Sequence, residues 1–211
     1  ALNSALARAS EKAGEEITEV TLCISSPFMR SEEVKISRVR RHPDDPVETK
    51  EIAELRAEAI KSRSGEKEKV YDAIAQFFDI DDHIGVPLED IVGMQGQNLD
   101  GYYKVVIGSA ASYNSRIETV KKCGLSIRRT IVSAIGAARG CIKENEAENG
   151  VVLLDIGAGL TELVIIKDKV IKEMVVIPFG GECITNDIKS ISCVTRDVAE
   201  LLKVRYGSCI E

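Results

Sequence analysis

The strongest constraint on the fold is a short apolar run that ends in an aspartate and a glycine-rich turn. Residues 151–154 are Val-Val-Leu-Leu, and such a run predicts a β-strand that is buried on both faces. The run leads into Asp155 and then into a turn with Gly157 and Gly159. Residues 163–166 and 170–177 are apolar again, so this part of the chain predicts a three-stranded meander whose first turn is rich in glycine.

The turn has the composition of a phosphate-binding loop. Gly157 and Gly159 tolerate positive φ angles and leave no Cβ in the way of a ligand. Consecutive backbone N–H groups in such a turn form a concavity that binds anions. Asp155 is placed to hold a hydrated Mg²⁺ or to orient water, and Thr161 adds a hydroxyl. An ordinary hairpin with an aspartate at the start of its turn explains these residues equally well.

A pair of glycines after the third strand predicts the start of a helix. Gly180 and Gly181 follow a Pro-Phe pair that ends the strand, and residues 182–188 continue as a helix. The first N–H groups of a helix have no partner within it. The glycine pair therefore predicts a second place where phosphate oxygens could bind.

A second helix is expected over residues 196–206, with Thr195 as its N-cap and Gly207 at its end. Glu200 and Lys203 are three residues apart, so they share a face, and a surface salt bridge is the usual role of such a pair. Three apolar side chains are expected to face the core: Val198, Leu201 and Leu202.

The rest of the chain alternates helical and strand patterns, which predicts a mixed α/β (α+β) fold. Residues 144–150 are polar and predict a linker, and a boundary between two structural units is expected near residues 125–130. Helices are expected over 1–14, 49–62, 112–123 and 133–143, strands over 17–25, 34–39, 70–80 and 103–108, and turns over 84–99.

Three further clusters have simple structural explanations. The basic residues of 38–42 favour a solvated strand edge over a phosphate site, because like charges discourage strand pairing. The acidic segment 79–83 lacks the glycine and the distal glutamate of a calcium loop, which favours an acidic loop. The six cysteines form no CxxC pair, which favours reduced, mostly buried thiols over a zinc site.

Composition excludes several classes of function. A net charge of −6 is a poor match to nucleic acid, because phosphate neutralisation needs a basic face. A hydrophobic fraction of 44% indicates a folded chain, and no apolar run is long enough for a transmembrane helix. The chain begins with Ala and ends directly after a helical pattern, so we expect a fragment of a longer protein.

Residues 154–162, Leu-Asp-Ile-Gly-Ala-Gly-Leu-Thr-Glu, resemble the second phosphate motif of the actin-like ATPase superfamily. Residues 133–138 resemble its small-residue connecting helix. Within the superfamily the sequence is identified as a member of the bacterial cell-division family FtsA. More specific stretches carry that identification: 177–181 with 184–188, 199–207, 92–99 and 120–125. The resemblance covers most of the chain and is weakest over residues 28–80.

The resemblance implies two domains. Residues 1–126 would be the FtsA-type inserted domain (SHS2-like), which contacts neighbouring FtsA molecules and late division proteins. Residues 127–211 would be part of a ribonuclease-H-like lobe of the actin fold. The family's first phosphate loop, its FtsZ-binding subdomain and its C-terminal amphipathic membrane helix are not in these residues. We therefore expect about half of a nucleotide site, and weak ATP binding by this chain alone.

The resemblance also implies ATP and Mg²⁺ as ligands, with Asp155 holding Mg²⁺ through water. Ala158 and Leu160 replace a commoner Gly and Thr, and the lost threonine hydroxyl argues against fast hydrolysis. Gly180 and Gly181 would approach the nucleotide, and Glu200 and Lys203 would contact ribose or adenine. The phosphates would be lined by Asp155, Gly157, Ala158, Gly159 and Thr161.

The function implied is a division scaffold and not an enzyme. Such a protein binds ATP, assembles with itself into filaments, and tethers FtsZ filaments to the cytoplasmic face of the inner membrane at the division site. Membrane contact would come only through the missing C-terminal helix. Alternatives with the same phosphate motif are an adaptor of pilus assembly and an actin-fold kinase or chaperone ATPase. A kinase needs a catalytic carboxylate on the substrate side, and residues 151–211 offer no clear candidate.

Overall fold

The computed structural model describes residues 2–209, so Ala1 of the first predicted helix lies outside the described residues. The helices are α1 Leu2–Ala13, α2 Thr49–Arg63, α3 Leu88–Ile91, α4 Ala110–Lys122, α5 Ser133–Cys141, α6 Glu144–Asn149, α7 Gly181–Ser192 and α8 Arg196–Tyr206. The strands are β1 Glu19–Ile24, β2 Arg30–Val39, β3 Glu68–Ile80, β4 His83–Val86, β5 Asn98–Ser109, β6 Ser126–Val132, β7 Val151–Ile156, β8 Thr161–Lys167 and β9 Val170–Ile177.

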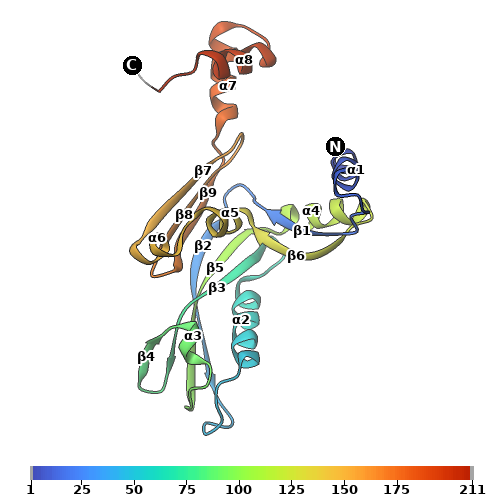
Figure 1. Cartoon of the computed structure of the whole chain (residues 1–211). Helices are drawn as coiled ribbons and strands as arrows, with labels where there is room; N and C mark the ends of the chain where they lie inside the picture. The colour runs from blue at the N-terminus through green and yellow to red at the C-terminus, as the bar shows by residue number, and fades with distance from the viewer. Residues whose placement is uncertain (1, 210–211) are drawn as a thin grey trace.

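The strands form two sheets. β1 and β6 pair in parallel, and the other seven strands form one sheet in the order β4-β3-β5-β2-β9-β8-β7. Figure 1 shows an elongated molecule, with β4 toward one end of the long sheet and the meander β7–β9 toward the other. Helices α7 and α8 extend beyond the meander and away from the sheet.

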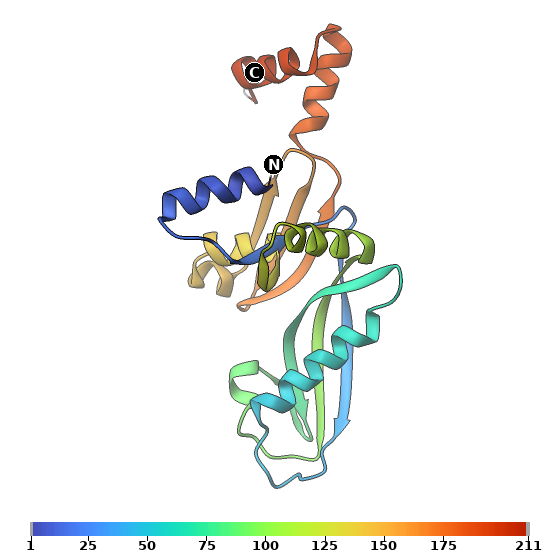
Figure 2. The same cartoon turned by 90° about the vertical axis from the view of Figure 1, so that its right-hand side faces the viewer.

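The first core lies between α2 and the strands β2, β3 and β5, and Figure 2 shows α2 crossing that part of the sheet. Ile52, Leu55 and Ala59 recur at helical spacing on α2 and are buried, as the sequence predicts. Phe78 and Tyr103 pack edge to face beneath them, with ring centroids 5.9 Å apart. The amphipathic pattern of α2 therefore fixes which face of the sheet it covers.

The second core lies between α5 and the meander. Ala134, Ile135 and Ala138 of α5 are buried in one cluster with residues of β8 and β9, among them Val164 and Met174. The small side chains of α5 let the helix approach the sheet closely. This core supports the strands that carry the glycine-rich turn.

A narrow junction joins the two parts of the long sheet. β2 and β9 pair only at Arg30 and Val175, beside a 3.0 Å hydrogen bond from the Val176 N–H to the Met29 carbonyl. Lys104 reinforces the junction, because its ammonium group lies 3.2 Å from Glu33 on β2 and 3.3 Å from Glu173 on β9. The division at residue 126 stays a prediction, since β1 also pairs with β6 across it.

Two predictions about residues 144–156 are wrong. The expected linker is helix α6, because the Lys143 N–H donates to the Glu146 carboxylate at 2.8 Å and caps the first turn. The strand expected to be buried on both faces is an edge strand, since β7 pairs only with β8. One face of β7 is open, and its three side chains are 52–63% exposed: Val152, Leu154 and Ile156.

Two predictions about side-chain burial are also wrong. Val198 and Leu201 are 42% and 57% exposed, because α8 packs on α7 and not on the sheet. The cysteines were expected to be mostly buried, yet all six are free thiols with at least partial exposure. Four of them are exposed: Cys23, Cys141, Cys193 and Cys209.

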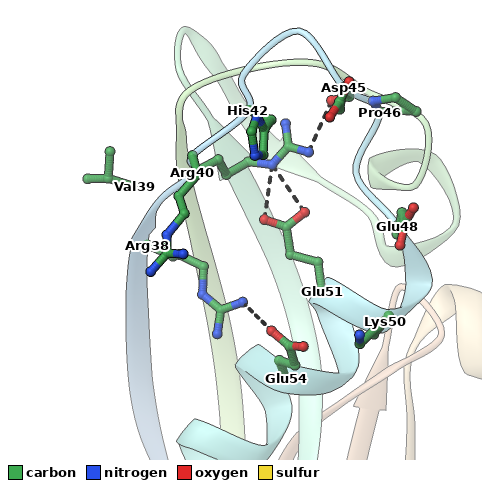
Figure 3. Close-up of a pocket in the computed structure, with 11 residues that line it drawn as sticks. Arg38, Val39, Arg40, His42, Asp45, Pro46, Glu48, Lys50, Glu51 and Glu54 are labelled. Atoms are coloured by element: carbon green, nitrogen blue, oxygen red, sulfur yellow. Dashed lines mark hydrogen bonds and ion pairs between the residues drawn. The ribbon is translucent and has the colours of Figure 1, made fainter.

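The prediction that the basic residues of 38–42 form a solvated strand edge is wrong for Arg40. Arg40 is buried, and its guanidinium donates to the Glu51 carboxylate at 3.0 Å, to the Gly96 carbonyl at 2.9 Å and to the Asp45 carbonyl at 3.0 Å. Figure 3 shows the Arg40 guanidinium bound to the Glu51 carboxylate, and both residues line a hollow of about 570 Å³. Acidic residues of α2 line the same hollow, so little net positive charge is left there to attract an anion.

The carboxylates of the acidic segment 79–83 accept hydrogen bonds from backbone N–H groups of two nearby segments. Asp79 accepts a hydrogen bond from the Gly85 N–H at 2.8 Å. Asp81 accepts from the N–H groups of Asn98 and Gln97, and these bonds lower the pKa of Asp81. Among residues 2–209, no helix has both the length and the apolar character needed to cross a bilayer.

Candidate functional site

The glycine-rich turn connects β7 to β8 at the end of the meander next to α7. Its first N–H, on Gly157, donates to the Leu160 carbonyl at 2.9 Å and closes the turn. The expectation that Gly157 and Gly159 use positive φ angles is wrong, since neither has one. Space explains Gly157, because a Cβ there would lie 3.1 Å from the Leu160 carbonyl oxygen, whereas a Cβ on Gly159 would meet nothing within 4 Å.

A hollow of about 260 Å³ lies over the turn. Asp155 and the three turn residues 157–159 line it, as the sequence predicts, together with Leu160. Two lining residues were missed: Glu162, which lies opposite Asp155 in the strand register, and Ser25, which follows β1. The period of two along β8 could have revealed Glu162, but no sequence signal links Ser25 to a turn 130 residues away.

The hollow is acidic. Glu162 is only 7% exposed, and burial raises its pKa, with a further rise from Asp155 and an opposing effect of the Ser25 hydroxyl. Two carboxylates at one end of a small hollow favour a cation. Mg²⁺ is usually held by one or two carboxylates together with substrate phosphates and water, so the residues present fit a Mg²⁺–phosphate group.

The glycine pair supports the turn from the side of α7. The N–H groups of Gly181 and Glu182 donate to the carbonyls of Gly157 and Ala158, at 3.0 and 2.7 Å. The expectation of free N–H groups at this helix start is therefore wrong. Gly180 makes the approach possible, because a Cβ there would lie 2.5 Å from the Gly157 carbonyl oxygen.

The same contact orients the N–H groups of the turn. All peptide bonds described are trans, so the N–H of each peptide unit points opposite to its carbonyl. The carbonyls of Gly157 and Ala158 point to α7, and the N–H groups of Ala158 and Gly159 therefore point away from it. In the part of the chain that the structure describes, these two N–H groups have no protein acceptor, which leaves them available for phosphate oxygens.

Thr161 does not line the hollow. Its side chain is buried, and its hydroxyl donates to the Phe179 carbonyl at 2.8 Å. This bond ties the start of β8 to the segment before the glycine pair. The structure thus places Thr161 beside the site as a support.

Glu200 and Lys203 form a polar cluster with Thr185 at the start of α7. The Lys203 ammonium group donates to Glu200 at 2.7 Å, to the Thr185 hydroxyl at 2.9 Å and to the Gly181 carbonyl at 3.2 Å. The bond from Lys203, then that from Thr185, lowers the pKa of Glu200. The predicted salt bridge is confirmed, and Lys203 contacts Gly181, the glycine whose N–H binds the turn. Thr185 was missed, although its place four residues after Gly181 puts both on one helix face.

Comparison with known proteins bears on these residues. Residues 152–211 match the family model described as "Cell division protein FtsA". The protein of that name from Neisseria meningitidis serogroup B is 28% identical over 207 residues, which are 98% of this chain and 49% of the relative. The one from Pseudomonas aeruginosa is 28% identical over 210 residues, or 99% and 49%. The chain thus spans about half the length of these curated relatives.

A solved structure shares the fold. The structure titled "PilM-PilN type IV pilus biogenesis complex" superposes with a TM-score of 0.66 at 18% identity, over 97% of this chain and 57% of that one. At that identity the likeness concerns the fold alone, and it confirms the predicted α/β (α+β) fold. By the family match over residues 152–211 and the relatives over nearly its whole length, the chain is similar to the FtsA cell-division proteins.

Proposed function

We propose that this chain is the nucleotide-binding part of a cell-division scaffold protein that binds ATP with Mg²⁺. The observation that carries the proposal is the hollow over residues 157–160. It combines the Asp155 carboxylate with two N–H groups, on Ala158 and Gly159, that have no acceptor among residues 2–209. A phosphate group carrying Mg²⁺ needs both kinds of partner.

Each part of the site has a role in this proposal. Asp155 orients the water of a hydrated cation, and the N–H groups of the turn bind phosphate oxygens. Gly180 and Gly181 hold the turn against α7, with Thr161 bracing it from β8. Glu200 and Lys203, which contact the Gly181 carbonyl region, are proposed to reach the ribose or base.

The cellular role is proposed from the family. ATP sets the conformation and self-assembly of the protein, which tethers FtsZ filaments to the cytoplasmic face of the inner membrane at the division site. Residues 1–126 provide the surface for late division proteins and for neighbouring copies. Binding, and not turnover, is the proposed activity, because Leu160 takes the place of a hydroxyl-bearing residue.

The test is Asp155→Ala in the full protein. Loss of the carboxylate is expected to weaken Mg–ATP binding by about 10-fold or more, measured by equilibrium dialysis, since cation-orienting groups typically contribute that much. Nucleotide-dependent assembly, measured by sedimentation, should fall with it. The matched control is Asp187→Ala, which removes the same charge from an exposed position on α7. Equal binding by both variants would reject the role of Asp155.

A further inference from the structure

A side chain from the first part of the sequence closes the hollow. Ser25 follows β1 directly, and its hydroxyl donates a 2.6 Å hydrogen bond to Oε1 of Glu162 on β8. Glu162 lies opposite Asp155 and is nearly buried. One hydrogen bond therefore joins the connection between β1 and β2 to the acidic end of the hollow.

This connection is short and is anchored at its far end. Met29 has no exposed surface, and its carbonyl accepts the N–H of Val176 on β9 at 3.0 Å. Between the two anchors, Phe28 has a φ of 61°, which is unfavourable for a bulky side chain, and its ring is 72% exposed. The segment from Ser25 to Arg30, where β2 begins, is short, so a displacement of Ser25 is transmitted to the start of β2.

A cation bound in the hollow would affect the hydrogen bond between Ser25 and Glu162. Ser25 and an incoming cation both interact with the charge on Glu162, so each weakens the interaction of the other. Asp155 lies across the strand pair from Glu162, which places the competing cation at the shared acidic end. The hydroxyl of Ser25 is thus held most firmly when the hollow carries no ligand.

We propose that the Ser25–Glu162 hydrogen bond couples occupancy of the phosphate hollow to the position of the β1–β2 connection. This inference rests on the proposed nucleotide binding and adds a regulatory step to it. An empty hollow holds Ser25, and a loaded hollow releases it, which shifts the start of β2 and the sheet that follows. Because coupling between two states is reciprocal, removing the hydroxyl favours the loaded state.

The exposed ring of Phe28 offers a reporter for this coupling. The chain contains no tryptophan, so Phe28→Trp introduces a single tryptophan within residues 1–211, which can be excited selectively at wavelengths where tyrosine does not absorb. Acrylamide quenching of that fluorophore is measured in the full protein with and without Mg–ATP, with the protein lacking Phe28→Trp as the blank. Three backgrounds are compared: Ser25, Ser25→Ala and Ser25→Thr. Ser115→Ala, at an exposed position on α4, is the matched control.

The proposal predicts how quenching and Mg–ATP binding change, both without ligand and with Mg–ATP bound. Without ligand, Ser25→Ala should already show the quenching that the Ser25 protein shows only with Mg–ATP, and adding Mg–ATP should change it no further. Equilibrium dialysis should show about fivefold tighter Mg–ATP binding by Ser25→Ala, because one hydrogen bond no longer has to be broken. Ser25→Thr keeps the hydroxyl and should match the unsubstituted protein.

Other results overturn the inference in distinguishable ways. Weaker Mg–ATP binding by Ser25→Ala would make Ser25 a direct ligand and not a link. Normal binding with the same quenching response in all backgrounds would show that no coupling exists. Absence of Mg–ATP binding by the unsubstituted protein would refute the proposed nucleotide function, and this inference with it.

Discussion

At the scale of single residues, Gly180 decides how the site is assembled. The carbonyl oxygens of Gly157 and Ala158 lie 2.5 and 2.6 Å from the place where a Cβ on Gly180 would be. Both are backbone atoms, so neither can move aside like the end of a flexible side chain. A hydrogen atom at this position is what lets α7 donate to the turn.

Gly180→Ala is therefore expected to destabilise the protein by about 1–3 kcal/mol, the range for overpacking a close contact. Gly140→Ala is the matched control, since a Cβ there meets nothing within 4 Å near the end of α5. The control should be neutral or stabilising by up to about 1 kcal/mol. Urea unfolding monitored by circular dichroism measures both, and equal midpoints would contradict the role of Gly180.

The residues of the turn could be predicted from the sequence because they are consecutive. Asp155, Gly157 and Gly159 carry their signal in one stretch, and the hollow includes all three. Ser25 and Thr185 could not be predicted in the same way, because their roles come from contacts across 137 residues and across two helices. Thr161 has the predicted hydroxyl, but the Phe179 carbonyl accepts its hydrogen bond, away from the hollow.

At the scale of elements, α7 and α8 form a pair held by charge as much as by apolar packing. Arg196 at the start of α8 forms two hydrogen bonds to the Glu182 carboxylate, at 2.8 and 2.7 Å. Lys203 and Glu200 form the second connection, through Thr185. The amphipathic pattern of α8 predicted the helix correctly but not the partner of its apolar face, because periodicity does not say what a face packs against.

The pairing of these helices should depend on pH. The bond from Lys203 lowers the pKa of Glu200, so its contribution is present above the unfolded value of about 4.3 and is lost as pH falls through the folded value. Contacts between α7 and α8 should therefore loosen below about pH 4. Amide exchange of α7, followed by NMR from pH 7 to pH 3, measures this.

The variant Glu200→Gln should remove that part of the pH dependence. Glu118→Gln, at an exposed position on α4, is the control and should leave it unchanged. The same acid-induced rise in α7 exchange in both variants would show that Glu200 is not the group responsible.

At the scale of the whole molecule, the junction between β2 and β9 decides whether the two parts of the long sheet behave as one unit. Backbone pairing there is limited to Arg30 and Val175. Lys104, 7% exposed, adds the charged contacts to Glu33 and Glu173. The sequence predicts most of the strands on both sides, but not this junction, because it depends on pairing between strands 140 residues apart.

Lys104→Met keeps the aliphatic stem and removes the ammonium group. The change should cost roughly 1–3 kcal/mol, the range for hydrogen bonds to charged groups, and should lower the midpoint of thermal unfolding. Lys172→Met is the control, because Lys172 is half-exposed and forms only a long ion pair of 3.8 Å, with Asp168. Differential scanning calorimetry distinguishes the cases, and a single unshifted transition in Lys104→Met would contradict the role of the junction.

The contact between α7 and the glycine-rich turn has an electrical consequence. A helix carries a partial positive charge of roughly half a unit at its N-terminus, and here that end meets the carbonyls of Gly157 and Ala158. Hydrogen bonds in series polarise one another, so the peptide groups of the turn become stronger donors on their opposite side. The turn thus extends the effect of the dipole of a twelve-residue helix to the N–H groups of Ala158 and Gly159.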